Sequence, residues 1–418
     1  MGKIYLDGYT GSIMASESIL DGMTILHGPG GCRSFPMNLS TRRVAREHSM
    51  TEGEFFFHNA RLPCTYVDSN DYIYGAAQKV SMILEILSSD DVRFATVIES
   101  PGAALIGDSL VDEVERSDVR DKALVVESSS ISARFSVGFD STLTKIVDKL
   151  TAGQISEHDP DTVNIIGLPF TQRGYEFVLQ EMTQLLGMMG LRVRAAIGAG
   201  CTIDDIKGSM GSSYNIVVFP EYCKQLGEYY EQRGIPQIVS EKGVPVGFDA
   251  IRAWYSNIGE KTGHDPSKVL DIIDSEEKRY RRLLDNSYVT VQYAYYRTFS
   301  ISAESSLVLP LMKWLVKECK STPVSIEFTE EDEKSVSEVD SLLQKMDWTE
   351  SKGVPVDSVY VDYLFGQGSY GRLRKMRREC LEYFDVNVPN KDFFDLAPKS
   401  VLGIQGCRMM MDRLFNAR

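Results

Sequence analysis

The chain has 418 residues, of which 43% are hydrophobic and 25% are charged, and its formal net charge is −14. This length exceeds what one hydrophobic core usually organises, so two or three domains are expected. Because so acidic a surface repels nucleic-acid backbones and anionic membranes, neither is expected as a main partner.

The location of the protein follows from what the sequence lacks. The opening residues, MGKIYLDGYTGS, have neither the basic start nor the apolar stretch of a secretory signal. No apolar run approaches the roughly 20 residues that cross a bilayer. The seven cysteines are scattered along the chain, which is typical of free thiols or metal ligands in a reducing compartment. We therefore expect a cytoplasmic protein.

Apolar runs typical of buried parallel strands recur along the chain, and helix-like segments separate them. The predicted strands form three sets, at 23–28, 93–100 and 123–129, then at 163–170, 191–198 and 214–221, and finally at 297–305, 322–330 and 358–371. This rhythm predicts an α/β fold with three Rossmann-like domains, each a parallel sheet flanked by helices. We place their boundaries at residues 1–155, 156–285 and 286–418, with a helix at the end of the third domain.

Ligands of open parallel sheets bind at the carboxyl ends of the strands, so the loops that follow the strands carry the candidate sites. The loop His27-Gly28-Pro29-Gly30-Gly31-Cys32 directly follows the first strand. Its glycines and proline predict a tight turn whose backbone approaches a bulky ligand closely and presents a sulfur to it. A thiolate near backbone amides is suited to ligating iron. The alternative is a structural turn with an inert thiol.

Several motifs resemble those of one family in order and spacing. Residues 27–32 are similar to the His-Gly-Pro-x-Gly-Cys loop of nitrogenase component 1 proteins, in which the cysteine ligates a cluster between two subunits. Residues 71–76 resemble that family's Asp-x-Val-Phe-Gly-Gly segment, and residues 99–108 resemble its Glu-Cys-Pro-x-Gly-Leu-Ile-Gly-Asp loop. Further matches continue to residues 403–407. The resemblance implies three Rossmann-like domains and an ATP-dependent iron-sulfur reductase, similar to the nitrogenase iron protein, as the electron donor.

The departures from the family pattern concern the cluster ligands. Ser100 stands where nitrogenases and tetrapyrrole reductases carry a cysteine, and serine binds iron less well. Asp7 replaces the family's first cysteine; it is either a ligand, as an aspartate is in a related reductase of chlorophyll synthesis, or a turn and helix cap. Cys64 either supplies the missing thiolate or is a packing residue. Cys32 and Cys64 from each of two subunits would give the four thiolates of a 4Fe-4S cluster at the subunit interface.

The same resemblance implies roles for other residues. His27, Gly28, Gly31 and Ser100 are expected to line the cofactor, with His27 in a supporting hydrogen bond or in packing. Cys201 falls in a strand-end loop that lines the substrate cavity in relatives, where it either contacts a substrate or fills space. The family's cysteine ligand for the large molybdenum-type cofactor is replaced here by a phenylalanine, Phe219, so that cofactor is not expected.

The resulting hypothesis is an oxidoreductase subunit of a homodimer, or of a pseudo-symmetric heterodimer or heterotetramer. No Gly-x-x-x-x-Gly-Lys-Ser/Thr motif occurs, so ATP hydrolysis is assigned to the partner reductase. The expected substrate is an unsaturated small molecule, with a tetrapyrrole as a candidate. The relatives include the dark-operative protochlorophyllide reductase and the Ni-sirohydrochlorin a,c-diamide reductive cyclase. The alternatives are a cofactor-assembly scaffold and a catalytically silent subunit.

Overall fold

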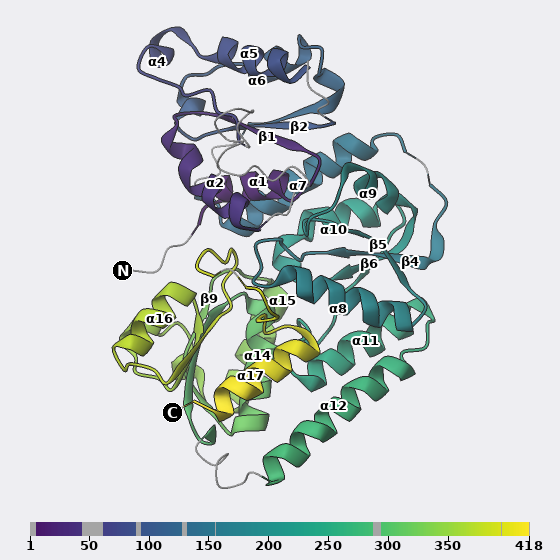
Figure 1. Cartoon of the computed structure of the whole chain (residues 1–418), viewed down its shortest axis with the longest axis vertical. Coiled ribbons are helices and arrows are strands. Elements are labelled where there is room, and N and C mark those ends of the chain that lie inside the picture. The colour runs from purple at the N-terminus through teal and green to yellow at the C-terminus, as the bar shows by residue number, and fades with distance from the viewer. Residues whose placement is uncertain are drawn as a thin grey trace.

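The structure is a computed structural model that describes residues 6–43, 62–88, 93–127, 132–154, 156–286, 294–393 and 395–417. The described residues form three parallel sheets flanked by helices, which confirms the predicted fold class. Figure 1 shows the three units in sequence, with the first at the top, the second in the middle and the third at the lower left. The predicted domain boundaries remain predictions, although they fall between the sheets.

The first unit is built on a sheet of three short strands in the order β1-β2-β3. Its strands are β1 (Met23–His27), β2 (Ala95–Glu99) and β3 (Ala123–Val126). Its helices are α1 (Gly8–Glu17), α2 (Gly31–Arg43), α4 (Asp71–Tyr74), α5 (Ala77–Ser88), α6 (Leu110–Glu115) and α7 (Phe135–Thr151), with the 3-10 helices η1 (Ala103–Leu105) and η2 (Arg120–Lys122). All five residues of β2 are buried, as expected for the middle strand of a covered sheet.

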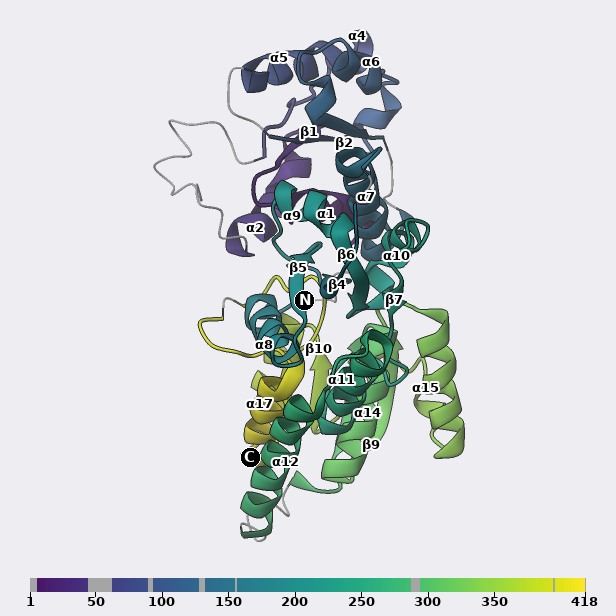
Figure 2. The ribbon, with the colours of Figure 1, turned by 90° about the vertical axis from the view of Figure 1, so that its right-hand side faces the viewer.

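Helix α1 is buried along its whole length because it packs unusually closely on α7. A Cβ atom on Gly11 would lie 2.0 Å from the carbonyl oxygen of Phe135, and one on Gly138 would lie 1.8 Å from that of Gly8. Glycine at these two positions therefore allows the helix backbones to approach each other. Helix α7 also packs on α10 of the second unit, and Figure 2 shows α1 and α7 next to that unit.

The second unit has four strands in the order β5-β4-β6-β7. The strands are β4 (Asp159–Ile166), β5 (Arg192–Ala196), β6 (Ser212–Val217) and β7 (Gln237–Ile238). The helices are α8 (Tyr175–Met188), α9 (Ile203–Gly208), α10 (Lys224–Glu231), α11 (Phe248–Thr262) and α12 (Ser267–Asn286), with the 3-10 helices η4 (Ser209–Gly211) and η5 (Pro220–Tyr222).

The third unit repeats this topology with the order β11-β10-β8-β9. The strands are β8 (Thr298–Ala303), β9 (Thr322–Phe328), β10 (Tyr363–Gly366) and β11 (Glu382–Asp385). The helices are α14 (Ser305–Cys319), α15 (Glu333–Lys345), α16 (Gly368–Met376) and α17 (Gly403–Phe415), with the 3-10 helices η7 (Thr349–Ser351) and η8 (Val356–Ser358). In both sheets the chain order reverses beside the first strand, which creates a crevice at the carboxyl edge.

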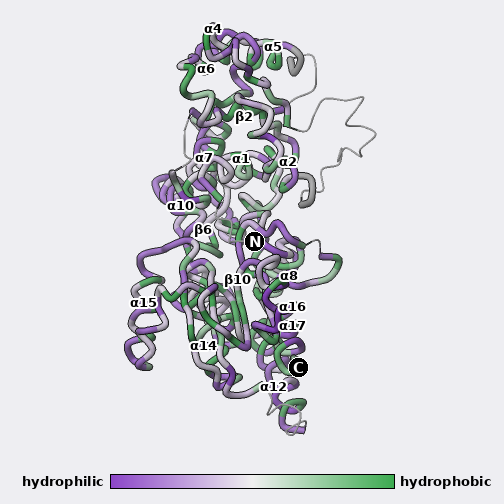
Figure 3. The backbone as a smooth tube through the Cα atoms, turned by 90° about the vertical axis from the view of Figure 1, so that its left-hand side faces the viewer, coloured by the Kyte–Doolittle hydropathy of each residue, from purple (hydrophilic) through white to green (hydrophobic). Residues whose placement is uncertain are grey.

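Central helices are more buried than outer ones, and the strands of the third unit differ from those predicted. Helix α14 is buried along most of its length, whereas α10 is buried only on the face that packs on α7, and Figure 3 shows mainly hydrophilic residues along α10. The predicted strand at 358–371 is only partly right, because β10 ends at Gly366 and α16 begins at Gly368. The strand β11 was not predicted.

In the part of the chain that the structure describes, no helix combines the length and hydrophobicity that a membrane span requires.

Candidate functional site

Cys32 lies at the start of a helix that follows the first strand. Strand β1 ends at His27 and α2 begins at Gly31, and the Cys32 amide donates a 3.0 Å hydrogen bond to the Pro29 carbonyl. The turn is tight, because a Cβ atom on Gly28 would lie 2.2 Å from the Ser100 hydroxyl oxygen. A Cβ atom on Gly31 would instead meet nothing within 4 Å. The loop therefore presents a half-exposed cysteine at the start of α2.

Cys64 is held next to this loop by a segment that runs alongside β1. The Leu26 amide donates to the Pro63 carbonyl at 2.8 Å, and the Thr65 amide donates to the Leu26 carbonyl at 3.0 Å. The Cys64 thiol donates to the Gly28 carbonyl at 3.2 Å. Burial raises the pKa of this thiol, a backbone hydrogen bond from Tyr66 and the charge of Arg33 lower it, and Cys32 adds to the rise. The structure thus places Cys64 against the backbone of the loop that carries Cys32.

Tyr9 lies beside both thiols, and sequence reasoning did not single it out. Burial raises the pKa of its hydroxyl, and Cys32, Cys64 and Asp7 raise it further in that order. This hydroxyl is buried and has no hydrogen-bond partner among the described residues. A buried donor without an acceptor is costly, so a group that accepts a hydrogen bond from Tyr9 would be favoured here. The signal in the sequence was the tyrosine of the Asp7-x-Tyr9-x-Gly11 segment.

The side chains of Asp7 and Ser100 both form hydrogen bonds with residues of their own segments. One carboxylate oxygen of Asp7 accepts hydrogen bonds from the Thr10 amide at 2.9 Å and from the Thr10 hydroxyl at 2.8 Å, so Asp7 caps α1. The Ser100 hydroxyl accepts a 3.2 Å hydrogen bond from the Ala103 amide and is buried against Gly28. Among the described residues, no group of three or more His, Cys, Asp or Glu side chains could hold a metal ion. The described residues of one chain therefore offer two thiols at these loops and not a complete ligand set.

His27 is buried at the end of β1 and forms no hydrogen bond through its ring among the described residues. Its Nε2 atom lies 3.6 Å from the Asp108 carboxylate. Burial lowers the pKa of the imidazole, although Asp108 and Asp71 oppose this. Asp108 accepts a 2.8 Å hydrogen bond from the Ala76 amide, and Lys79 forms a 2.6 Å ion pair with Asp71. The three segments that resemble the family therefore meet around His27.

The structure separates the second-unit candidates from the two thiols. Cys201 is buried against Ile19, and burial raises the pKa of its thiol to about 12. Phe219 is fully buried at the carboxyl edge of the second sheet, next to the crevice. Its ring packs edge to face on Tyr222, which packs in the same way on Phe135 and Phe139. Aromatic side chains thus fill the junction of the units.

Large apolar side chains surround the Cys32 loop on the surface. A Cβ atom on Gly30 would lie 2.7 Å from the Tyr66 ring, and one on Gly102 would lie 3.2 Å from the Tyr72 hydroxyl, so both tyrosines adjoin the loop. The exposed members of this group, which we call the apolar rim, are Tyr66, Tyr72, Ile73, Tyr74 and Leu105. Exposed clusters of this kind mark surfaces that bind other proteins.

A cavity of about 310 Å³ lies between the first and third units, at the carboxyl edge of the third sheet. Phe135 and Phe328 supply apolar walls, and Leu6 lies three residues before Tyr9. Two buried polar atoms of lining residues, the Thr329 hydroxyl and the Asn387 side-chain oxygen, have no partner among the described residues. Arg134, Glu330 and Lys391 also line the cavity, so its wall is partly apolar and partly charged. Cavities with convergent polar groups between apolar side chains are candidates for small-molecule sites.

Comparisons with known proteins cover almost the whole chain. A family model described as "Nitrogenase component 1 type Oxidoreductase" matches residues 8–417. The chain is 26% identical to one of the subunits of light-independent protochlorophyllide reductase from Halorhodospira halophila (strain DSM 244 / SL1) over 209 residues, which are 46% of this chain and 39% of that protein. It is 24% identical to the nitrogenase iron-molybdenum cofactor biosynthesis protein NifE of Clostridium pasteurianum over 298 residues, which are 69% of this chain and 59% of that protein.

These matches span less than two thirds of the length of either relative. A structure described as "Nitrogenase Cp1 at pH 6.5" superposes with a TM-score of 0.74 and 15% identity, covering 100% of this chain and 94% of that one. This structural likeness shows a shared fold, and the family model shows that the sequence matches the family as well. The chain therefore belongs to the nitrogenase component 1 type oxidoreductases.

Proposed function

We propose that the chain is an iron-sulfur oxidoreductase subunit in which Cys32 and Cys64 hold half of a 4Fe-4S cluster. A second subunit, either a copy of this chain or a homologous one, supplies the other two thiolates. Electrons come from a separate ATP-dependent iron-sulfur reductase and reduce an unsaturated small molecule. Family membership supports this class of reaction, and the residues around the two sulfurs support the site.

The observation that carries the proposal is the arrangement of two sulfurs and one unpartnered hydroxyl. Cys64 donates a hydrogen bond to the loop that carries Cys32, and the buried Tyr9 hydroxyl, whose pKa both thiols raise, has no acceptor among the described residues. Sulfur atoms of a cluster accept hydrogen bonds, and such bonds help set its reduction potential. The residues present therefore fit a cluster, which would supply one-electron transfer.

The apolar rim supports the location of the cluster at a subunit interface. Tyr66 and Tyr72 adjoin the Cys32 loop, and Ile73, Tyr74 and Leu105 extend the exposed surface around it. A second subunit seated on this rim would bury these side chains and exclude water from the thiolates. Both effects favour a buried cluster over a solvent-exposed one.

The cavity at the third sheet is the proposed substrate site. The Leu6–Tyr9 segment connects its wall to the tyrosine whose pKa the two thiols raise, and we infer from this connection that electrons pass from the proposed cluster to the cavity. Its volume of about 310 Å³ suits a small unsaturated molecule or one part of a tetrapyrrole. The Thr329 hydroxyl and the Asn387 carbonyl oxygen would orient polar groups of the substrate. Cys201 does not line this cavity, so we assign it to packing.

A large molybdenum-type cofactor does not fit the junction of the units. Phe219, Tyr222, Phe135 and Phe139 pack there ring against ring, and all four are buried. A thiol ligand at position 219 is also missing. We therefore propose that the chain acts without this cofactor.

The second candidate function is a scaffold that holds a cluster or a cofactor precursor during assembly. The similarity to NifE of Clostridium pasteurianum, which covers 69% of this chain, supports it. A catalytically silent subunit is the remaining alternative, because the chain has fewer thiols at the cluster loops than the family pattern. Metal content separates these three functions.

The test is iron and sulfide analysis of protein purified without oxygen. About four irons per dimer, with the visible absorption of a 4Fe-4S cluster, are expected for the oxidoreductase. Cys32→Ala and Cys64→Ala should each remove most of this iron, whereas Cys380→Ala, which changes a buried cysteine of the third unit, should keep it. A larger labile cofactor would support the scaffold, and unchanged iron in both site variants would overturn the ligand assignment.

A further inference from the structure

Three carboxyl groups, those of Glu221, Glu304 and Glu330, are buried at the junction of the units. Glu304 and Glu330 follow the neighbouring strands β8 and β9, and the Ser305 amide joins the two turns by donating a 3.0 Å hydrogen bond to the Glu330 carbonyl oxygen. Glu221 lies in η5, at the carboxyl edge of the second sheet. The three side chains therefore come from the edges of two sheets that face one another.

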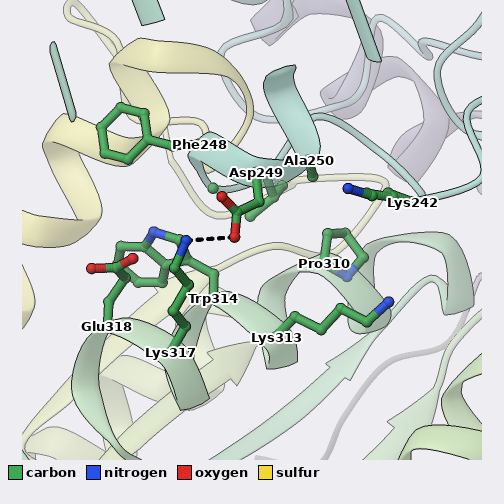
Figure 4. A pocket seen from close by; sticks show the side chains of 11 residues that line it. Lys242, Phe248, Asp249, Ala250, Pro310, Lys313, Trp314, Lys317 and Glu318 are labelled. Atoms are coloured by element: carbon green, nitrogen blue, oxygen red, sulfur yellow. Dashed lines mark hydrogen bonds and ion pairs between the residues drawn. The ribbon is translucent and has the colours of Figure 1, made fainter. Parts of the chain in front are cut away.

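These carboxyl groups bind hydroxyl groups and form no ion pair within the described part of the chain. The nearby Arg134 pairs with Glu331 instead. Figure 4 shows a different arrangement in a cavity between α11 and α14, where the Asp249 carboxylate forms a 2.6 Å ion pair with Lys317. Without a cation to stabilise the charged form, a buried carboxyl group favours the protonated form. The hydroxyl donors at the junction are Ser305 and Ser306 for Glu221, Tyr222 for Glu304 and Ser136 for Glu330.

Glu304 is the most enclosed of the three, with 0% of its surface exposed. Its Oε1 atom accepts the hydrogen bond from Tyr222, whereas its Oε2 atom is buried without a partner among the described residues. The pKa of this carboxyl is raised to about 8, mainly by burial and additionally by Glu221 and Glu330. We therefore expect Glu304 to hold a proton at neutral pH, and the charges of both neighbours act on that proton.

The group of carboxyls reaches a cavity at each end. Glu330 lines the cavity at the third sheet, which is the proposed substrate site. Ser306, which donates to Glu221, lines a separate cavity of about 320 Å³ beside α15. The exposed residues Val239 and Lys334 also line this second cavity, so solvent reaches it. The buried carboxyl groups thus lie between solvent and the proposed substrate site.

We propose that Glu221, Glu304 and Glu330, which we call the carboxyl path, carry protons from solvent to a substrate in the cavity at the third sheet. This inference rests on the proposed reduction of an unsaturated molecule there. Reduction of one double bond takes up two electrons, which come through the cluster, and two protons. A bound substrate excludes bulk water from the cavity, so the protons have to come through the protein.

The protons move along the carboxyl path in balanced steps. Glu330 donates its proton to the substrate and becomes a carboxylate. Glu304 then protonates Glu330, and Glu221 protonates Glu304 after taking up a proton from the solvent-filled cavity. Rotation of the carboxyl groups or internal water makes the hydrogen bonds for each step. After two such cycles the substrate has gained two hydrogens and the path has returned to its protonated state.

The test is hydrogen–deuterium exchange of the Glu304 carboxyl proton, followed by infrared spectroscopy after the full chain is mixed into D2O at pH 6. The band of this carboxyl is identified as the one that Glu304→Gln lacks. On a connected path the proton should exchange within seconds, whereas a carboxyl sealed in a core exchanges only when the protein opens, in minutes to hours. Exchange as slow as that of the β8 amides, or absence of the band, would overturn the proposal.

Variants show whether both ends of the carboxyl path are open. Glu221→Gln and Glu330→Gln keep the shape of the side chain but remove a group that takes up and releases protons. Each change alone leaves one open end, so exchange should stay fast, whereas the double variant should slow it at least about tenfold. Glu318→Gln changes a buried glutamate at the far end of α14 and is the matched control, with the wild-type rate expected.

The remaining outcomes separate this inference from the proposed function. Fast exchange in the double variant would place the route elsewhere, and slow exchange in either single variant would mean that only one end is open. Both results would overturn the carboxyl path. Iron analysis of the same wild-type sample tests the cluster independently. Slow exchange with the expected iron would overturn the path alone, whereas missing iron would overturn the proposed function whatever the exchange rate.

Discussion

The carboxyl edges of the first and second sheets differ in how they are packed. After β1 the chain turns through glycines and leaves Cys32 half-exposed at the start of α2. After β6 it buries Phe219, and a Cβ atom on Gly167 would lie only 2.4 Å from the Phe219 carbonyl oxygen. Both strands belong to parallel sheets, but the turn after β1 is rich in glycine and the one after β6 is a 3-10 helix. The difference teaches that one fold can keep a ligand site open at one edge and fill the corresponding crevice at another.

The closed junction also contains buried carboxyl groups. Glu221 accepts hydrogen bonds from the hydroxyl groups of Ser305 and Ser306, both at 2.8 Å, and thereby joins the second unit to the third. Glu330 accepts a 2.7 Å hydrogen bond from Ser136 of the first unit. Three units therefore meet through hydrogen-bonded carboxyl groups. This region joins the three units, whereas the loop after β1 carries the proposed cluster ligand.

The largest expected effect comes from opening the closed edge. Phe219→Ala leaves a cavity among packed rings, so the free energy of unfolding should fall by about 3–5 kcal/mol. Ile73→Ala removes an exposed side chain of the apolar rim and should change the stability of the single chain by about 0.5 kcal/mol or less. Denaturant unfolding measures both values. Similar losses in the two variants would show that the edges do not differ in packing.

A smaller effect is expected from the carboxyl group of Glu304, which is fully buried at the same junction. Its pKa is raised to about 8, mainly by burial and additionally by Glu221 and Glu330, while the hydrogen bond from the Tyr222 hydroxyl opposes the shift. The folded protein therefore keeps a proton that the unfolded chain releases near pH 4.5. Stability should fall as the pH rises from 4.5 to 8, because the unfolded state then binds fewer protons.

Glu304→Gln isolates this contribution. A single carboxyl group titrating in this way changes stability by about 1.4 kcal/mol per pH unit, so the wild type should lose up to roughly 3 kcal/mol more than the variant between pH 6 and pH 8. Denaturant unfolding at each pH measures the slope. Glu231→Gln, an exposed change on α10, is the control and should keep the wild-type slope. A wild-type slope in Glu304→Gln would mean that Glu304 is ionised in the folded protein.

The sequence predicts the fold better than the details of the site. Repeated apolar runs followed by helix-like segments predicted three parallel sheets, because strands buried on both faces need continuous apolar residues. The strand β11 was missed, since Glu382 and Asp385 make that run look polar. Both carboxylates are buried, and the ion pairs of Glu382 with Lys375 and Arg413 keep the pKa of its carboxyl below its usual value. Whether such a polar run forms a buried strand depends on ion-pair partners in other helices, which the run itself does not reveal.

The candidate site was likewise predicted only in part from the sequence. The sequence predicted that loops after the strands carry candidate ligands, and the structure brings the segments around Cys32, Asp71 and Ser100 to one edge. The sequence left Asp7 open between a ligand and a helix cap, and the structure shows the cap, whereas the unpartnered hydroxyl of Tyr9 depends on three-dimensional contacts. The closure of the second sheet by aromatic rings was likewise invisible, since Phe135 and Phe219 are far apart along the chain.

The smallest effect on the single chain, and the sharpest test of the open edge, concerns the apolar rim. Leu105 and Leu396 are 84% and 85% exposed, so Leu105→Asp and Leu396→Asp should each change the stability of one chain by about 0.5 kcal/mol or less. If the rim is the subunit interface, only Leu105→Asp places a charge in a buried contact, and it should weaken dimerisation at least about tenfold in sedimentation velocity. It should also lower the iron content, because the cluster needs both subunits. Equal dimerisation of the two variants would place the interface elsewhere and leave Cys32 without a partner thiolate.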